Sequence, residues 1–522
     1  MEWAFTVPGE SFLGLLEELP KAGIRLVATR HEGGASFMAE AVGQLTGRPA
    51  AVMGTRAVGG GNMAIGIHTA RQNSTPMVAL LGQVERRFRG REAFQEAELA
   101  QTIGGLAKWA AEFDDPSRAA DLLGDGLRTM ASGRPGPVLY ALPEDVGDLE
   151  VAVDHLPVIP VPTPPPDPAA VFAAVDLLVS AQRPLILAGA GVLRAGATDD
   201  LVELAEALDV PVMSAWRRPD AFPNDHRLFL GVTGYGSAST VLPRLQAADA
   251  LLVIGCRLNE IASFEYRVPA STTRWAHVDL EPRTAHAGLA APNISVSADA
   301  GDFVRAALAM EVRAVGSRAS NEADRAAYLA ASEADDGRPW DGPGVHPGRT
   351  VATMQRVLPA DAILTTDAGN FGLWLARGYR YSQPGTFLGP TSGAMGYGLP
   401  SAIAASLCRP GRVVVGVCGD GGFAMTMNEI ETAVREGATP IVVIFDNRRY
   451  GTITMHQARR GSPPVATDLG PIDFAAVAEA SGALGLRVER DADFEPALRQ
   501  AIEARRPAVI HLQLDRRWES PD

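Results

Sequence analysis

The sequence predicts an α/β protein of three doubly wound domains, each built on a parallel sheet. Apolar runs of strand length alternate with helical patterns through the 522 residues, and this alternation is typical of parallel sheets flanked by helices. Two segments look like linkers, namely the proline-rich residues 156–168 and the polar residues 316–348. The expected domains are therefore residues 1–155, 165–320 and 345–522.

Composition excludes several classes of protein. The chain is 46% hydrophobic and 21% charged, its net charge is −14, and it has no long run of one sign. Neither nucleic acid nor an anionic membrane is an expected partner of such a chain. No apolar run reaches the length of a membrane span, and residues 1–10 lack the features of a signal peptide. We therefore expect a cytoplasmic protein with reduced cysteines at Cys256, Cys408 and Cys418.

In the first domain, strands are expected at residues 3–7, 24–29, 50–54 and 76–81. A helix is expected over residues 35–45, whose apolar positions recur at helical spacing. Glu32 lies between a strand and this helix, where helix capping alone explains a carboxylate. Residues 55–62 contain three consecutive glycines and are expected to form a loop, with the next helix beginning at Met63.

In the middle domain, strands are expected at residues 184–188, 250–255 and 275–280. The turn from Gly189 to Gly191 is similar to a nucleotide-binding turn, but a glycine turn this short is a weak signal. Structural packing is therefore the favoured interpretation of this turn. No other segment of the domain has the spacing of a catalytic motif.

In the third domain, strands are expected at residues 362–366, 413–418, 440–445 and 508–514. The helical spacing of Met427, Ile430 and Val434, with Gly437 as the stop, places a helix between the second and third of these strands. A strand–helix–strand unit of this kind makes a right-handed crossover. Its two strands are therefore expected to be parallel neighbours in the sheet.

Asp420 and Asn447 follow the carboxyl ends of these two strands, at the edge where open α/β sheets bind their ligands. A carboxylate, an amide oxygen and a turn carbonyl suit Mg²⁺ that also binds diphosphate oxygens. Gly421 and Gly422 allow the backbone to approach a phosphate closely, with a helix N-terminus behind them. By itself, the Gly419–Gly422 segment is equally consistent with an ordinary turn.

The stretch from Gly419 to Asn447 resembles the cofactor motif of thiamine-diphosphate enzymes, which runs from Gly-Asp-Gly to a pair of asparagines. The resemblance implies that Asp420 and Asn447 bind Mg²⁺ through their side chains and Arg449 through its carbonyl. Asp446 replaces the first asparagine of the pair, at a position that is not a metal ligand in the family. Thiamine diphosphate and Mg²⁺ are therefore the expected cofactors.

Residues 29–40 look like the glutamate motif of the same enzymes. The resemblance implies that Glu32 hydrogen-bonds the aminopyrimidine ring and so prepares the cofactor to remove its own C2 proton. Gly393 and Met395 match the element that contacts this ring and supports the bent cofactor, although a lone methionine is also a common core residue. The full set of expected cofactor-binding residues is Glu32, Ala368, Gly369, Asn370, Gly393, Met395, Gly419, Asp420, Gly421, Gly422, Asn447, Tyr450, Gly451 and Thr452.

The order of the motifs resembles that of acetolactate synthases and benzoylformate decarboxylases over essentially the whole chain. Residues 94–96 match a segment of acetolactate synthases that reaches the active site, so Gln95 is a second catalytic candidate, although a solvated helix residue is equally consistent. His456 takes the place of a tryptophan of the synthases and is a third catalytic candidate. Further departures are Arg56 in the glycine loop, Glu144 in place of a lysine and Thr452 in place of an apolar residue. Arg56, Thr452 and His456 imply a pocket more polar than one for two pyruvates.

The resemblance implies decarboxylation of a 2-oxo acid and carboligation of the enamine to a second carbonyl compound, hence a lyase or transferase. It implies a homodimer or homotetramer in which Glu32 of one subunit meets Asp420 of another. A helix that usually precedes the strand at residues 3–7 is missing or displaced. Three further interpretations stay open: a decarboxylase or aldehyde lyase without ligation, an oxidase that holds FAD in the middle domain, and a non-catalytic binding protein.

Overall fold

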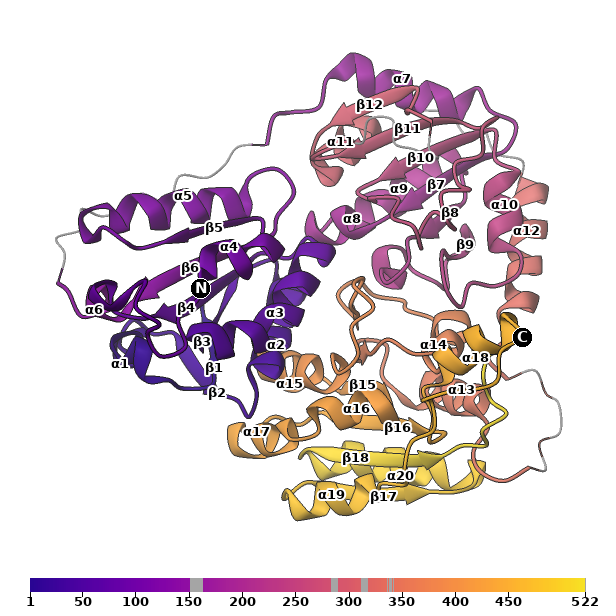
Figure 1. The fold of residues 1–522 in the computed structure, drawn as a ribbon. Helices are drawn as coiled ribbons and strands as arrows, with labels where there is room; N and C mark the ends of the chain where they lie inside the picture. The colour runs from indigo at the N-terminus through magenta and orange to yellow at the C-terminus, as the bar shows by residue number, and fades with distance from the viewer. Residues whose placement is uncertain are drawn as a thin grey trace.

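The computed structural model describes residues 1–150, 163–282, 290–310, 318–335, 337, 340 and 342–521. It contains three sheets of six strands, and every strand pairing in them is parallel, as the sequence predicted. Figure 1 shows the three domains as separate lobes, and the carboxyl-terminal end of the chain lies where the middle and third lobes meet. Residues 156–162 of the first expected linker lie outside the described part of the chain.

The first sheet has the strand order β2-β1-β3-β4-β6-β5. Its strands are β1 (Trp3–Thr6), β2 (Arg25–Ala28), β3 (Ala50–Thr55), β4 (Met77–Gln83), β5 (Trp109–Glu112) and β6 (Pro137–Pro143). Its helices are α1 (Leu13–Lys21), α2 (Glu32–Thr46), α3 (Arg56–Asn73), α4 (Leu99–Thr102), α5 (Ala119–Ala131) and α6 (Glu144–Gly147).

The loop expected at residues 55–62 is wrong, because α3 begins at Arg56, directly after β3. The consecutive glycines belong to the first turns of this helix. A Cβ on Gly59 would lie 2.9 Å from the backbone of Gly54, so the missing side chain lets the helix pack against the end of its own strand. Tertiary packing here overrides the low helix propensity of glycine.

The middle sheet has the order β12-β11-β10-β7-β8-β9. Its strands are β7 (Pro184–Ala188), β8 (Val212–Ser214), β9 (Phe229–Val232), β10 (Ala250–Ile254), β11 (Arg274–Asp279) and β12 (Ile294–Ser297). Its helices are α7 (Pro168–Val179), α8 (Ala190–Arg194), α9 (Thr198–Leu208), α10 (Val241–Gln246), α11 (Ala300–Leu308) and α12 (Arg318–Ala331). Helix α12 occupies much of the second expected linker. Its Tyr328 is buried against Phe229, and its Asp324 pairs with Arg244 at 2.7 Å, so this polar segment packs on the middle domain.

The third sheet has the order β14-β13-β15-β16-β18-β17. Its strands are β13 (Ile363–Thr366), β14 (Phe387–Leu388), β15 (Val414–Gly419), β16 (Ile441–Asp446), β17 (Leu484–Val488) and β18 (Ala508–Gln513). Its helices are α13 (Pro347–Val357), α14 (Gly372–Gly378), α15 (Gly398–Cys408), α16 (Asp420–Thr426), α17 (Glu429–Glu436), α18 (Gly451–Arg459), α19 (Phe474–Ala480) and α20 (Asp491–Ala504). The single helix expected after β15 is two helices, α16 and α17, and Gly437 ends the second with a φ of 68°.

The first and third domains share a hydrophobic core, because α2 packs against the small-residue helix α15 (Figure 1). The buried Glu40 of α2 lies in this contact and accepts hydrogen bonds from Asn73 at 2.8 Å, Thr75 at 2.7 Å and Tyr397 at 2.5 Å. These donors satisfy a carboxylate that has no access to water. The contact fixes one face of the first domain on the third within the chain.

None of the helices in the described ranges is both long and apolar enough to cross a membrane. The cysteines are free thiols: Cys256 and Cys418 are buried and Cys408 is half-buried. This outcome confirms the expectation of reduced cysteines.

Candidate active site

Three adjacent strands of the third sheet bring the predicted metal site together. Strand β15 pairs in parallel with β13 on one side and with β16 on the other, and Gly419 lies opposite Phe445. Asp420 and Asp446 therefore leave the sheet side by side. The expectation that these two strands are parallel neighbours is confirmed.

Asp420 and Asp446 form a buried pair of acids. Burial, together with the charge of Asp446, raises the pKa of Asp420 to about 7, although backbone N–H groups of Gly421 and Arg449 oppose this shift. Burial would also raise the pKa of Asp446, but hydrogen bonds from His511 at 2.8 Å and from the backbone of Arg448 at 2.9 Å bring it below its usual value. Two acids this close favour a proton or a cation between them.

The predicted metal donors fit Mg²⁺ chemically. Asp420 and Asn447 are each 7% exposed, and the peptide N–H of Arg449 donates to the Asp420 carboxylate, so the three residues are neighbours. In the described part of the chain, no group of three or more His, Cys, Asp or Glu side chains could hold a metal ion. The predicted set does not require one, because it combines a carboxylate with an amide oxygen and a peptide carbonyl, which are ligands that Mg²⁺ accepts.

The expected diphosphate loops also contact one another. A Cβ on Gly421 would lie 2.7 Å from the Tyr450 ring, so this glycine permits the loop after β15 to pack under the loop after β16. The position of a Cβ on Gly451 is 2.8 Å from the Asn370 amide, which in turn donates to the carbonyl of Glu519 at 2.7 Å. The loops after β13, β15 and β16 thus form one continuous surface.

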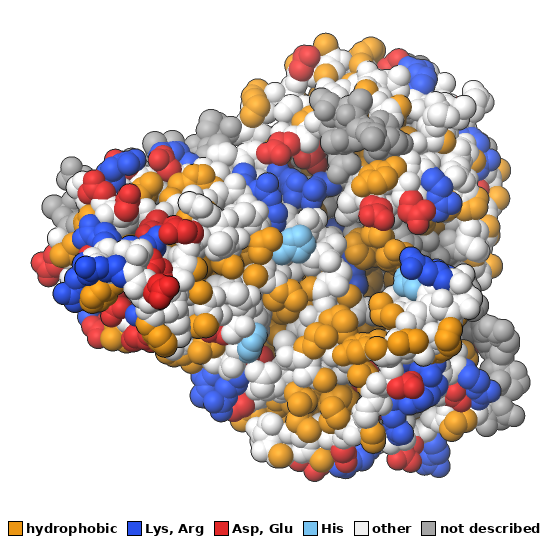
Figure 2. All heavy atoms as spheres, viewed as in Figure 1, with side chains coloured by type: hydrophobic (Ala, Val, Ile, Leu, Met, Phe, Trp, Pro, Cys, Tyr) orange, Lys and Arg blue, Asp and Glu red, His pale blue; other side chains and the backbone are white. Residues whose placement is uncertain are grey.

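A cavity of about 560 Å³ opens beside this surface, where the middle and third domains meet. Figure 2 shows a hollow between these lobes that is rimmed by hydrophobic side chains. Six of the predicted site residues line the cavity: Ala368, Gly369, Asn370, Gly393, Thr452 and His456. Met395 is half-buried two residues beyond Gly393. A volume of this size suits a small organic ligand.

Glu32 and Gln95 lie around the N-terminus of α3 in the first domain. Glu32 is 9% exposed, and its Oε2 accepts a hydrogen bond from the amide of Asn62 at 2.9 Å. The Gln95 carbonyl accepts from the backbone of Ala57 at 3.4 Å, and its side-chain Oε1 is buried without a hydrogen-bond partner. Gln95 has a φ of 61° and belongs to a turn, so the interpretation of this residue as part of a helix is wrong.

Asn62 is a site residue that the sequence interpretation missed. It falls in the expected glycine loop, and only the helical geometry of α3 turns it toward Glu32. The useful signal would have been a polar residue between one and two helical turns beyond Arg56, where the helix begins.

Glu32 and the third-domain loops do not meet within one chain. Asn62 bonds Glu32, whereas Asn73 at the far end of α3 accepts a hydrogen bond from Thr391, near Gly393, at 2.9 Å. The helical rise separates Asn62 from Asn73 by about 16 Å. Between the described residues, no hydrogen bond or ion pair joins Glu32 to the third domain.

Two departures from the synthase pattern compensate each other. Arg56 pairs with Glu144 at 2.9 Å and with Glu10 at 3.2 Å. Within one chain, the cavity beside Thr452 and His456 does not include Arg56, and a pocket lined by all three residues stays a prediction for a site shared between subunits. Arg56 and Glu144 replace a small residue and a lysine with a pair of opposite charges.

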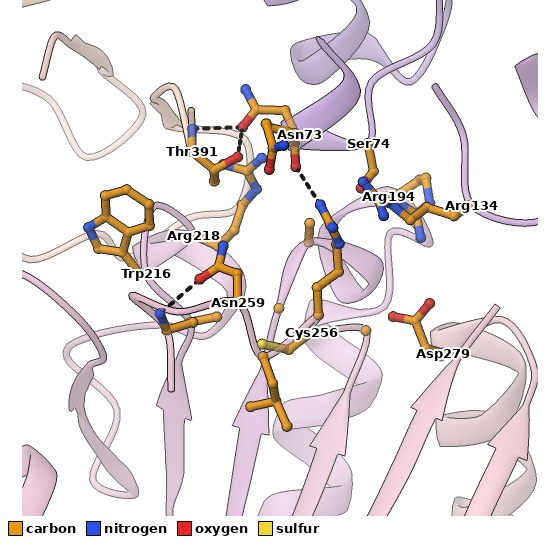
Figure 3. Close-up of a pocket in the computed structure, with 18 residues that line it drawn as sticks. Asn73, Ser74, Arg134, Arg194, Trp216, Arg218, Cys256, Asn259, Asp279 and Thr391 are labelled. Carbon is orange, nitrogen blue, oxygen red and sulfur yellow. Dashed lines mark hydrogen bonds between the residues drawn. The ribbon is translucent and has the colours of Figure 1, made fainter. Parts of the chain in front are cut away.

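The middle domain has a crevice between β7 and β10, where the strand order reverses. Figure 3 shows Arg134 and Arg194 near Asp279 on one side of it, and Arg218 near Trp216 on the other. Burial, followed by the charges of nearby arginines, lowers the pKa of Arg134 to about 9.

The glycine turn beside this crevice has a structural role. The N–H groups of Gly189 and Gly191 donate to the carbonyls of Ile254 and Gly255, each at 2.9 Å, which confirms the packing interpretation. The crevice measures about 50 Å³, room for only a few water molecules. A second cavity, of about 570 Å³, adjoins it and shares Asn73, Arg194 and Arg218 with its lining.

The fold and these sites define a class of protein, an α/β enzyme that binds a phosphorylated organic cofactor at the edges of two of its sheets. Three family models match the chain: the N-terminal thiamine pyrophosphate binding domain over residues 1–102, the central domain over 171–307, and the C-terminal thiamine pyrophosphate binding domain over 367–512. The chain belongs to the thiamine pyrophosphate enzyme family.

Relatives with assigned names cover nearly the whole chain. It is 31% identical to a sulfoacetaldehyde acetyltransferase of Rhodobacter capsulatus, over 96% of this chain and 89% of the relative. It is 30% identical to an acetolactate synthase of Mycobacterium bovis, over 95% of this chain and 83% of the relative. It is 28% identical to a probable acetolactate synthase large subunit of Methanocaldococcus jannaschii, over 98% of this chain and 89% of the relative. The enzyme is thus of the acetolactate-synthase-like type.

Proposed function

We propose that this enzyme decarboxylates a 2-oxo acid and joins the remaining fragment to a second carbonyl compound. The observation that carries the proposal is the division of the site into two halves. A buried carboxylate, Glu32, is oriented by Asn62 in the first domain, and oxygen donors cluster around Asp420 in the third. Thiamine diphosphate, when bound, supplies an electron sink for the pair released with CO₂.

The residues of the third domain have binding roles in this proposal. Asp420 and Asn447 hold Mg²⁺ with their side chains, and Arg449 holds it with its carbonyl. The loops at residues 368–370, 419–422 and 450–452 take the diphosphate, and residues 393–395 take the rings. Buried neighbours support these roles, because the acid pair of Asp420 and Asp446 lacks a counter-ion other than His511 among the described residues.

The residues of the first domain act on protons and on the substrate. Glu32, held in place by Asn62, accepts a hydrogen bond from the aminopyrimidine, and general acid–base help of this kind contributes about 10²- to 10⁴-fold to a rate. The buried Oε1 of Gln95 has no hydrogen-bond partner among the described residues and could accept a hydrogen bond from substrate. His456, exposed at the cavity, is the third candidate for contact with the substrate.

The active site is proposed to lie between subunits of a homodimer or homotetramer, and mixing two inactive variants tests this. Glu32→Gln and Asp420→Asn chains are co-expressed with different tags, and the hybrid oligomers are purified. If Glu32 of one subunit meets Asp420 of the other, half of the sites in a hybrid dimer are intact. The purified hybrid dimer should then have about half of wild-type activity, and an unfractionated random mixture about a quarter. No recovery would place both residues in one chain's site and contradict the proposal.

The names of the relatives differ in what happens after decarboxylation, so ligation itself needs a test. Holoenzyme is incubated with a panel of 2-oxo acids, with and without aldehydes or a second 2-oxo acid, and CO₂ and product masses are recorded. A product containing both carbon skeletons supports carboligation. Release of free aldehyde alone would favour a decarboxylase or aldehyde lyase that does not ligate.

An oxidase or a non-catalytic binding protein has weaker support than either of these activities. The relatives reported above carry the names of synthases and of an acetyltransferase, and none carries the name of an oxidase. Absorbance near 450 nm in the purified protein, roughly the range of a bound flavin, would favour an oxidase after all. A non-catalytic role would require the Glu32→Gln change to leave every turnover unaltered. The cytoplasmic location remains a prediction.

A further inference from the structure

Arg217 lies in the wall of the cavity between the middle and third domains and adopts a strained backbone conformation. Its φ is 62°, in the left-handed region that an arginine rarely occupies. Strain of this kind persists where surrounding structure imposes it, and it is concentrated at functional sites. The conformation directs the side chain along the cavity wall, with the guanidinium 5.4 Å from the centre of the Trp216 ring.

The guanidinium of Arg217 is only partly satisfied by the protein. One terminal nitrogen donates to the carbonyl of Asp367 at 2.9 Å, while Nε is buried and has no hydrogen-bond partner. No carboxylate in the described ranges forms an ion pair with it. Burial lowers the pKa of Arg217 to about 10, in spite of the nearby charge of Asp367, but the group is still charged at neutral pH. A buried, charged donor that has a carboxylate nearby but no direct ion pair among the described residues is costly unless a ligand supplies one.

The rest of the cavity wall has the same sign of charge. The described residues that line it include no aspartate or glutamate. They do include three arginines and a histidine, namely Arg217, Arg377, Arg459 and His456. Arg377 donates to the carbonyl of Ser237 at 3.3 Å and contributes positive charge to the wall. Arg459 is exposed at the end of α18. A cavity lined by one sign of charge concentrates ligands of the opposite sign.

The carboxylate that leaves as CO₂ is a poor match for Arg217. Its negative charge is lost from that group as the bond breaks, so an ion pair with a guanidinium would stabilise the starting state more than the transition state. A negative group that keeps its charge from substrate to product can be bound equally well in the starting state and in the transition state. Binding energy from a part of the substrate remote from the reacting bond also helps to position the bond that reacts.

We propose that this cavity selects a substrate bearing an anionic group that is retained in the product, such as a second carboxylate, a sulfonate or a phosphonate, and that Arg217 binds that group with help from Arg459. The inference rests on the proposed function, because it takes the cavity to be the substrate side of the thiamine diphosphate site. It narrows the substrate class from 2-oxo acids and carbonyl compounds in general to those with a further negative charge.

A binding measurement tests this independently of turnover. Holoenzyme loaded with thiamine diphosphate and Mg²⁺ is titrated calorimetrically with glutarate and with pentanoate, unreactive acids of equal carbon number that differ by one charge. We expect glutarate to bind about tenfold to a hundredfold more tightly, the size of a hydrogen-bonded charge contact. Equal affinities for the two acids would overturn the proposal.

The Arg217→Gly variant separates binding from folding. Glycine accepts a positive φ without strain, so we expect its Tm to match or exceed that of the wild type, while the preference for glutarate falls at least about tenfold. A lowered Tm with the preference retained would make Arg217 a structural residue. Weaker binding of thiamine diphosphate with the preference retained would assign Arg217 to the cofactor instead. Either result overturns the proposal.

The neighbouring arginines of α18 supply a matched pair. Arg459→Gln should weaken glutarate binding about threefold at low salt, an effect that screening reduces at higher salt. Arg460→Gln, a change one residue further along and outside the cavity lining, should leave binding unchanged. Equal losses in the two variants would show a general surface-charge effect and count against the proposal.

Turnover then distinguishes this inference from the proposed function. The ratio of kcat/KM for 2-oxoglutarate over 2-oxopentanoate, and the same ratio for anionic over neutral acceptor aldehydes, are measured in wild type and in Arg217→Gly. A ratio above about ten in either series that collapses in the variant supports the inference. Turnover without any charge preference would overturn the inference and leave the proposed function standing. Anion binding without CO₂ release from any 2-oxo acid would overturn the proposed function, and with it the substrate assignment made here.

Discussion

The first and third domains have the same strand order, yet the charge at the start of the equivalent helix is paired in the first domain and faces a like charge in the third. In both, the second strand in sequence lies outside the first, followed across the sheet by the third, fourth, sixth and fifth strands. The helix after the third strand begins with Arg56 in one domain and with Asp420 in the other. Arg56 has two carboxylate partners, Glu10 and Glu144, whereas Asp420 faces a second acid.

This difference shows how one topology serves two tasks. The charge at the start of α3 is balanced within the first domain, so that edge needs no cation and presents Glu32 with its amide partner. The equivalent position in the third domain faces a second acid, and in the proposed function a cation from solution balances this pair. The fold supplies the edge, and residues in the loops decide its chemistry.

The largest effect is expected from removing the carboxylate at the first edge. Glu32→Gln should lower kcat by about a hundredfold to ten-thousandfold, because the group proposed to assist proton movement is lost. Binding of thiamine diphosphate should change little, since the metal donors remain in the third domain. Steady-state kinetics and calorimetry measure the two quantities, with the exposed Glu17→Gln as a control. A loss of cofactor affinity as large as the loss of kcat would contradict the proposal that Glu32 acts on protons while the third domain binds the cofactor.

A change at the second edge should produce the opposite pattern. Asp420→Asn removes a proposed metal ligand, so the affinity for Mg²⁺ should fall at least about tenfold, and thiamine diphosphate binding should fall with it. Excess Mg²⁺ should restore part of the activity, which it cannot do for Glu32→Gln. Chelation of the wild type with EDTA should release the cofactor in the same way. Tight cofactor binding in a metal-free protein would show that the acid pair has another role.

The sequence predicts the three parallel sheets well, because each central strand is a continuous apolar run between turn signals. It does less well with short or peripheral strands such as β14, which has two residues and is defined only by its neighbour β13. It also missed β6, a seven-residue strand that pairs with both β4 and β5. The helix α12 was hidden in a polar segment, since its stability depends on the packing of a few residues such as Tyr328 rather than on an apolar pattern.

The site was predicted in parts. Motif spacing located Asp420 and Asn447 at one sheet edge and Glu32 at the start of a helix, and the structure has these positions. Pairings between distant residues were not visible in any local pattern. Arg56 with Glu144 and Asp446 with His511 are separated by 88 and 65 residues respectively, and only the folded sheets bring them together. The strained Arg217 likewise has no signature in the sequence.

A smaller effect is expected from the amide that orients Glu32. Asn62→Ala removes the hydrogen bond to its Oε2, so kcat should fall about tenfold, which corresponds to the loss of one hydrogen bond to a charged group. Asn62→Gln, which keeps an amide on a longer side chain, should recover part of the rate. A loss of rate that is equal in Asn62→Ala and Asn62→Gln would reduce Asn62 to a packing role.

The smallest effect concerns the balanced charges at the first edge. Arg56 is 10% exposed and Glu144 33% exposed in their side chains, so their pairing should contribute about 1 kcal/mol to local stability. Since a three-domain chain does not unfold in two states, the measure is the hydrogen-exchange opening free energy of α3 amides. Arg56→Met and Glu144→Gln should each lower it by about 1 kcal/mol, and the double change by no more than either. Additive losses would mean that the two residues act independently. The pairing of Arg56 with Glu144 would then not be what stabilises the sheet edge of the first domain.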